Sequence, residues 1–271
     1  MKIKEENYKT IDLFSYCKKT GLSDLDSNYF IKNISNYDIK KQIRLIKRLK
    51  KEPLQYVLEK TNFYGYDYKV NKNVLIPRFE TEELVEATIK YIKRHFNNKV
   101  KVLDLGTGSG CIGITIKKEL PNIDITISDI SSKALLVAKE NSKRIDIKIV
   151  KGNLLDPFLN KKEKFNVIIC NPPYIARTDK IDKMVKNNEP HLALYARENG
   201  LFYYNKILKD INKVLEDDFV IAFEIGSSQK DDIISIIEAN LTNIKIEVKK
   251  DLQGRDRMIF IHNLTNNKKD V

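Results

Sequence analysis

The stretch VLDLGTGSGCIG, residues 102–113, places a short apolar segment before a glycine-rich turn and a second apolar segment. The chain of 271 residues has only 10 glycines, yet four of them lie within eight positions: Gly106, Gly108, Gly110 and Gly113. Glycine permits tight turns and lets the backbone approach a ligand closely. The stretch therefore predicts a strand, a ligand-binding turn and a helix, in that order.

Strands and helices alternate on both sides of this turn. We predict strands at residues 100–105, 123–129, 145–150, 165–170, 219–225, 244–249 and 258–262, and helices at residues 112–120, 133–143, 200–215 and 230–240. Such alternation predicts a parallel sheet covered by helices on both faces. The loop between the last two strands is too short for a helical crossover, so they should pair antiparallel. The expected fold class is α/β, a doubly wound, mostly parallel, seven-stranded sheet.

The first 60 residues predict a small helical domain. Apolar side chains recur at spacings of four and three from Ile39 to Leu49, and lysine and arginine fill the positions between them. This pattern predicts an amphipathic helix that ends near Pro53 and has a basic outer face. The basic face is either a solvated surface or a docking surface for an acidic partner.

Aromatic and β-branched residues dominate residues 61–77, where we predict a β-hairpin with its turn at residues 71–73. Helical periodicity resumes at Glu82, and Thr81 is expected both to cap that helix and to border the ligand pocket. The expected domains are a helical docking domain (1–60), a hairpin linker (61–80) and a catalytic domain (81–271).

Composition excludes several classes of protein. Hydrophobic residues make up 42% of the chain, which excludes a fully disordered protein. No apolar run reaches the ~18 residues of a membrane span, and the first ten residues lack the apolar core of a secretory signal. The three cysteines are far apart and the three histidines lack ligand spacing, so we expect no disulfides, no metal and a cytoplasmic location. The net charge of +12 fits a nucleic-acid partner or a lysine-rich solvated surface equally well.

The glycine turn and the next strand predict a nucleotide-like cofactor. The turn comprises Gly106, Thr107, Gly108, Ser109 and Gly110. Asp129 ends the following strand, about 20 residues on, where a carboxylate can accept hydrogen bonds from both hydroxyls of a ribose. The pattern alone does not separate a nicotinamide dinucleotide from S-adenosylmethionine, because both contain adenosine.

The tetrad Asn171-Pro172-Pro173-Tyr174 follows the predicted strand at 165–170 and should lie at the carboxyl edge of the sheet. Prolines stiffen the backbone and offer carbonyl groups without N–H donors, and Asn171 adds a side-chain oxygen. Such acceptors suit a planar NH2 group, as in a carboxamide or a base amine. They would stabilise the positive charge that grows on nitrogen during methyl transfer.

This tetrad resembles that of amino-group methyltransferases, and further segments in matching order resemble the release-factor glutamine methyltransferases, the PrmC/HemK family. These segments are PLQY (53–56), FYG (63–65), LIPRFETEELV (75–85), EP (189–190), FEIG (223–226) with Gln229, and DLQGRDR (251–257). The resemblance implies a Rossmann-like methyltransferase sheet with a small N-terminal helical domain.

The resemblance also implies an activity. Family members transfer methyl from S-adenosylmethionine to the side-chain amide nitrogen of the glutamine in the Gly-Gly-Gln motif of class 1 peptide-chain release factors. By motif, residues 106–110 and Asp129 would bind the cofactor, together with Asn153, Leu154 and Asn171. Asn171, Pro172 and Tyr174 would be catalytic, and the substrate would also contact Pro173 and Leu75.

Two other functions remain open on the sequence. An N6-adenine methyltransferase acting on DNA or RNA uses the same tetrad and would suit the basic charge. A binding protein that keeps the fold without catalysis is the second. The ordered matches outside the tetrad favour a release-factor substrate, so direct nucleic-acid binding is not expected.

Overall fold

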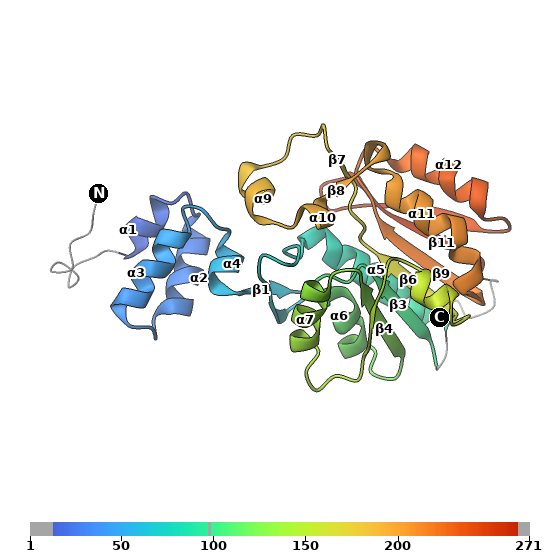
Figure 1. Ribbon diagram of the computed structural model, residues 1–271, viewed down its shortest axis with the longest axis horizontal. Helices are drawn as coiled ribbons and strands as arrows, with labels where there is room; N and C mark the ends of the chain where they lie inside the picture. Colours follow the sequence, from blue (N-terminus) through green and yellow to red (C-terminus); the bar gives the residue numbers. More distant parts are fainter. Residues whose placement is uncertain (1–12, 97–98, 265–271) are drawn as a thin grey trace.

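The computed structural model describes residues 13–96 and 99–264. A central sheet carries helices on both faces, and a group of four short helices stands to one side of it (Figure 1). Among the described residues the sheet has seven strands, and their order is β10-β11-β9-β6-β3-β4-β5. In this sheet β11 runs opposite to the other six strands: it pairs antiparallel with β10 and β9, and all other pairs are parallel. The predicted fold class and the antiparallel final pair are confirmed.

The strands have the following bounds: β3 Lys101–Leu105, β4 Asp124–Asp129, β5 Lys148–Lys151, β6 Phe165–Cys170, β9 Leu215–Glu224, β10 Lys245–Lys250 and β11 Asp256–His262. The chain leaves β3 toward β4 on one side, and β6 pairs in parallel on the other side of β3. The order of strands reverses here, and open α/β sheets bind ligands in the crevice at this point. The glycine turn after β3 and the tetrad after β6 therefore come to the same crevice.

Two apolar layers hold the helices against the sheet. One face is covered by α5 Phe79–His95, α6 Cys111–Glu119 and α7 Ser132–Asn141; the other by α8 Asp156–Leu159, α11 Phe202–Asp210 and α12 Lys230–Asn240. Ile114, Ile127 and Phe260 are fully buried in the first layer, and Tyr204 and Phe223 in the second. Burying each such side chain stabilises the fold by roughly 1.5–3 kcal/mol.

The N-terminal helices enclose an apolar cluster of their own. They are α1 Leu13–Lys18, α2 Asp24–Ile34, α3 Ile39–Arg48 and α4 Leu54–Leu58, and Cys17, Phe30 and Ile46 are buried among them. Asp38 caps α3 by accepting a hydrogen bond from the backbone N–H of Lys41. The predicted amphipathic helix is confirmed, since its apolar side chains are buried while several of its lysines and arginines are exposed.

The hairpin turn is not where the sequence placed it. Strands β1 Lys60–Phe63 and β2 Tyr66–Lys69 are joined by Tyr64 and Gly65, whose φ angles are 52° and 77°. Two positive φ angles define the type I′ turn that matches the twist of a two-residue hairpin. The prediction of this turn at residues 71–73 is wrong, because that segment forms a separate turn after the hairpin, closed by a bond from the Val74 N–H to the Asn71 carbonyl.

The helix after the hairpin begins at Phe79, and its N-cap residue, Arg78, makes no capping bond through its side chain. Thr81 lies inside the first turn, where its hydroxyl donates to Glu224 at the end of β9, with 2.6 Å between the oxygens. The prediction that Thr81 caps this helix is therefore wrong. The reason is that the helix begins at Phe79 and not at Glu82, so Thr81 is already a helical residue and its N–H bonds the Arg78 carbonyl.

The segment between β6 and α11 contains structure that the sequence did not predict. It comprises β7 Ile175–Ala176, α9 Lys183–Asn188, α10 His191–Leu194, β8 Tyr195–Ala196 and the 3-10 turn η2 Glu198–Gly200; a second 3-10 turn, η3 Ile211–Val214, follows α11. The short strands β7 and β8 pair in parallel. In Figure 1 the part that carries α9 extends away from the sheet on the side of the N-terminal helices.

Candidate active site

A pocket opens at the carboxyl ends of β3, β4 and β6, the crevice that the strand order predicts. Of the sequence-predicted site residues, the structure brings eleven to its lining: Leu75, Gly106, Thr107, Gly108, Ser109, Asp129, Asn153, Leu154, Asn171, Pro172 and Pro173. Thr81 also borders it, which confirms that part of its prediction. Gly110 and Tyr174, which were also predicted, do not line it.

The glycines after β3 divide into two roles. Gly106 and Gly108 have φ angles of 76° and 56°, and a Cβ atom at either would meet no atom within 4 Å. Their backbone thus borders open space that a ligand can fill. At Gly110 and Gly113 a Cβ atom would lie 2.7 Å from Ile114 Cδ1 and 2.5 Å from Ile127 Cγ2. These two glycines let α6 pack closely, so they support the site without facing it.

Asp129 connects the glycine turn to the end of β4. Its Oδ2 accepts from the Gly108 N–H at 2.9 Å, and its Oδ1 accepts from the Ser131 N–H at 2.8 Å. Burial raises the pKa of this carboxyl, while the backbone N–H groups oppose the rise. An ionised carboxylate only accepts and has about four lone-pair sites, so it retains acceptor capacity for a hydroxyl of a ligand beside these N–H groups.

Asn171 directly follows β6 and lines the pocket, and a hydrogen bond fixes its side-chain amide. Its Nδ2 donates to the Thr81 hydroxyl at 3.1 Å. No donor to its Oδ1 is found among residues 13–96 and 99–264, so this oxygen remains an acceptor. Pro172 and Pro173 follow it along the pocket lining. Asn171, Pro172 and Pro173 therefore lie along the edge of the pocket near β6.

Tyr174 lies behind the pocket wall. Its hydroxyl donates to Oε1 of Glu224 at 3.1 Å, and its ring packs against the apolar layer that contains α11 and α12. Burial, followed by the nearby Glu224 charge, raises the pKa of this phenol. Asn171 and the two prolines therefore line the pocket, whereas the Tyr174 side chain lies outside the lining and is bonded to Glu224.

A buried ion pair that sequence reasoning missed builds the opposite wall. Glu189, whose side chain is 1% exposed, accepts from Arg78 at 2.7 Å and from the Ile76 N–H at 3.1 Å. These bonds hold the segment that carries Leu75 over the pocket. The partners are 111 and 113 residues apart, and the only signal in the sequence was the Glu-Pro pair at 189–190.

Asp104, at the floor of the glycine turn, gives a pH-dependent stability. It is fully buried, and this burial raises its pKa from 3.8 to about 6, although Oδ2 accepts from Thr107 and from the Gly113 N–H. Between pH 4 and 6 the folded protein keeps a proton here that the unfolded chain has released, so its stability falls as pH rises through this window. This rise of the pKa from 3.8 to about 6 corresponds to about 3 kcal/mol of stability.

Asp104→Asn cannot ionise at this position. We therefore expect the free energy of unfolding of this variant, relative to that of the wild type, to increase by about 3 kcal/mol as the pH rises from 4 to 7. Urea unfolding of both proteins without cofactor, repeated at several pH values, measures this difference. The other carboxyl groups contribute equally to the pH dependence of both proteins, so their contributions cancel in the difference. A difference that does not change with pH would contradict the assignment.

Comparison with known proteins identifies the class first. The family model described as methyltransferase small domain matches residues 81–200. The 16S rRNA N2 G1207 methyltransferase of T. thermophilus, solved with AdoMet and guanosine, has the same fold: its TM-score is 0.53 at 13% identity, over 75% of this chain and 49% of that one. The matched family model and the shared fold are those of methyltransferases.

Two relatives narrow the class to a family. A protein of Bacillus anthracis is 39% identical over 213 residues, which are 77% of this chain and 75% of that protein. A protein of Mycoplasma mycoides subsp. mycoides is 36% identical over 273 residues, 97% and 96% of the two chains. Both are named release factor glutamine methyltransferase. The chain belongs to the release factor glutamine methyltransferase family.

The pocket residues fit S-adenosylmethionine. Gly106 and Gly108 leave room for a ligand against the backbone, and Asp129 has free lone pairs for a ribose. The buried hydroxyl of Ser128, also in the lining, has no hydrogen-bond partner among the described residues, so it is available to a polar ligand group. Within those residues no helix is long and apolar enough to cross a membrane, and no group of three metal-ligating side chains lies together.

Proposed function

We propose that this protein transfers a methyl group from S-adenosylmethionine to the side-chain amide nitrogen, N5, of the glutamine in the Gly-Gly-Gln motif of peptide-chain release factors. The observation that carries the proposal is the position of Asn171 and its two prolines. They form a rigid edge of acceptors beside the glycine turn, in one pocket with Asp129. The names of the relatives supply the substrate class.

The cofactor would lie across the ends of β3 and β4. Gly106 to Ser109 would cradle it, with Gly110 supporting the turn from the α6 side; Asp129 would accept from its ribose, and Asn153 and Leu154 would border its adenine. When bound, it supplies an electrophilic methyl carbon on a sulfonium. The residues of the chain would hold that carbon in line with the incoming nitrogen, which turns a bimolecular reaction into an effectively unimolecular one.

The substrate amide would lie between Leu75 and the tetrad. An amide nitrogen is a poor nucleophile because its lone pair is delocalised into the carbonyl group. Oδ1 of Asn171 and the Pro172 carbonyl would accept its two N–H bonds and so orient the lone pair toward the methyl carbon. These dipoles would stabilise the positive charge on nitrogen more in the transition state than in the ground state. The cofactor would leave as a neutral thioether, and the methylated nitrogen would release one of its two protons to water. Tyr174 would act from behind by holding this segment.

We also propose three parts for the chain: a docking domain (1–60), a linker (61–80) and a methyltransferase domain (81–271). The N-terminal helices would bind the protein substrate. The exposed lysines and arginines of α3 form a basic face opposite its apolar side. A class 1 release factor acting in the cytoplasm would bind here. Nucleic acid is not the expected partner.

The test is methyl transfer to a purified release factor compared with transfer to DNA or RNA. We expect mass spectrometry to find one added methyl group on the peptide that contains Gly-Gly-Gln, and a Gln→Ala substitution in that motif should abolish it. A labelled product that nuclease destroys would support adenine methylation instead. Cofactor binding without transfer to either substrate would indicate a binding protein.

A further inference from the structure

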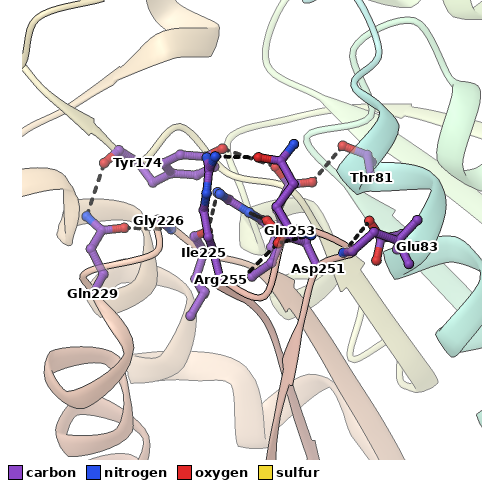
Figure 2. Close-up of polar contacts among 12 residues, drawn as sticks. Thr81, Glu83, Tyr174, Ile225, Gly226, Gln229, Asp251, Gln253 and Arg255 are labelled. Atoms are coloured by element: carbon purple, nitrogen blue, oxygen red, sulfur yellow. Dashed lines mark hydrogen bonds and ion pairs between the residues drawn. The ribbon is translucent and has the colours of Figure 1, made fainter.

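A buried carboxylate lies behind the tetrad. Glu224, the last residue of β9, is 1% exposed. Its Oε2 accepts from the Thr81 hydroxyl at 2.6 Å, and its Oε1 accepts from the Tyr174 hydroxyl at 3.1 Å. In Figure 2 Thr81 and Tyr174 lie on opposite sides of the group of side chains drawn between them. Two segments that are distant in sequence, the start of α5 and the tetrad, are therefore connected through one side chain.

With Glu224 ionised, the hydrogen bonds of Thr81 have only one consistent direction. A threonine hydroxyl carries a single proton, and an ionised carboxylate can only accept. Thr81 therefore gives its proton to Glu224 and has only lone pairs left for Asn171. The Asn171 amide must then present its NH2 group to Thr81, which leaves its oxygen for the pocket.

We propose that Thr81 and Glu224 are positioning residues that fix the amide of Asn171 with its oxygen toward the substrate; this inference rests on the proposed function. An asparagine amide is nearly symmetrical in shape, so without a directional partner it can turn by 180°. It would then present NH2 to the NH2 group of the substrate, and two donors cannot bond. The chain from Glu224 through Thr81 to Asn171 prevents this inversion.

The backbone of the tetrad is held separately from this chain of side chains. Gln229 donates from Nε2 to the carbonyls of Tyr174 and Asn199, each at 3.1 Å, and accepts from the Gly226 N–H at 3.0 Å. Figure 2 shows Gln229 on the far side of Tyr174 from Thr81. Removing the Thr81 hydroxyl therefore leaves the tetrad backbone in place and changes only the support of the Asn171 amide.

The experiment compares Thr81→Val, which keeps the shape and removes the hydroxyl, with Thr81→Ser, which keeps the hydroxyl. We expect the valine variant to lose about 10-fold in kcat toward the release factor, roughly the effect of one hydrogen bond. Its cofactor Kd should stay within about 2-fold, and serine should restore most of the rate. Thr81→Ala, measured alongside, should match valine, so the result does not depend on how one variant folds.

Thr88→Val is the matched control. Thr88 is buried in the same helix, and its hydroxyl donates to the Leu84 carbonyl within that helix, so its removal should leave kcat unchanged. In the Asn171→Ala background, Thr81→Val should cause no further loss, because the group that it orients is absent. Wild-type rates in Thr81→Val, or losses that multiply in the double variant, would overturn the inference. A wild-type enzyme inactive on release factors would instead overturn the proposed function.

Discussion

Asn171→Ala is expected to lower the rate of methyl transfer to a release factor by ~100-fold or more while changing the Kd for S-adenosylmethionine by less than about 3-fold. In the proposed function this substitution removes one of two acceptors for the substrate nitrogen, and a preorganised polar group of this kind contributes ~100-fold to 1,000-fold in kcat. The glycine turn and Asp129, the proposed main contacts of the cofactor, are unchanged in this variant. Single-turnover kinetics and isothermal titration measure the two quantities separately.

Asn166→Ala is the control for this result. Asn166 lies on the same strand but at its opposite end, where it bonds the Lys101 N–H and the Asp218 carbonyl. Its removal should change neither quantity by more than about 2-fold. If Asn171→Ala reduced cofactor affinity as much as the rate, Asn171 would be chiefly a structural residue.

Asp129→Ala is expected to weaken S-adenosylmethionine binding by ~100-fold. Each hydrogen bond to a charged group contributes about 1.5–3 kcal/mol, and the carboxylate can accept two from a ribose. The variant also frees the Gly108 N–H, which Asp129 now holds at 2.9 Å, so the turn loses a restraint. Titration calorimetry with the cofactor measures the effect.

Asp124→Ala is the matched substitution at the other end of β4, where the side chain is exposed, and it should bind the cofactor as the wild type does. Asp129→Asn should fall between the two, since it keeps one acceptor and loses the charge. Affinity within about 3-fold of the wild type in Asp129→Ala would place the ribose elsewhere in the pocket.

Local patterns in the sequence predicted much of the fold. The alternation of apolar strands and helices predicted the order of elements in the large sheet, and the short loop between β10 and β11 predicted that these two strands pair antiparallel. The glycine turn and the tetrad could be placed in one crevice because each follows a strand, and parallel strands end at the same edge. Each of these two motifs consists of consecutive residues, so its chemical character can be predicted from one sequence.

Contacts between distant segments could not be predicted. Thr81 reads as a helix cap on its own, and only the folded sheet brings it to Glu224, 143 residues away. Tyr174 was expected to face the substrate, but its phenol finds a buried acceptor behind the loop. The hairpin turn at Tyr64 and Gly65 was missed because a tyrosine at positive φ is uncommon, and the asparagines at 71 and 73 fit turn preferences better.

Because Pro172 and Pro173 carry no N–H, this edge of the pocket can bind an amide only through the hydrogens of that amide. An unmodified glutamine brings two such hydrogens, one for each acceptor. After one transfer the nitrogen would keep a single hydrogen, and the new methyl group would face an oxygen with which it cannot form a hydrogen bond. If the proposed function holds, the loop that binds the substrate would therefore bind the product less well, and we expect the protein to stop at one methyl group per glutamine.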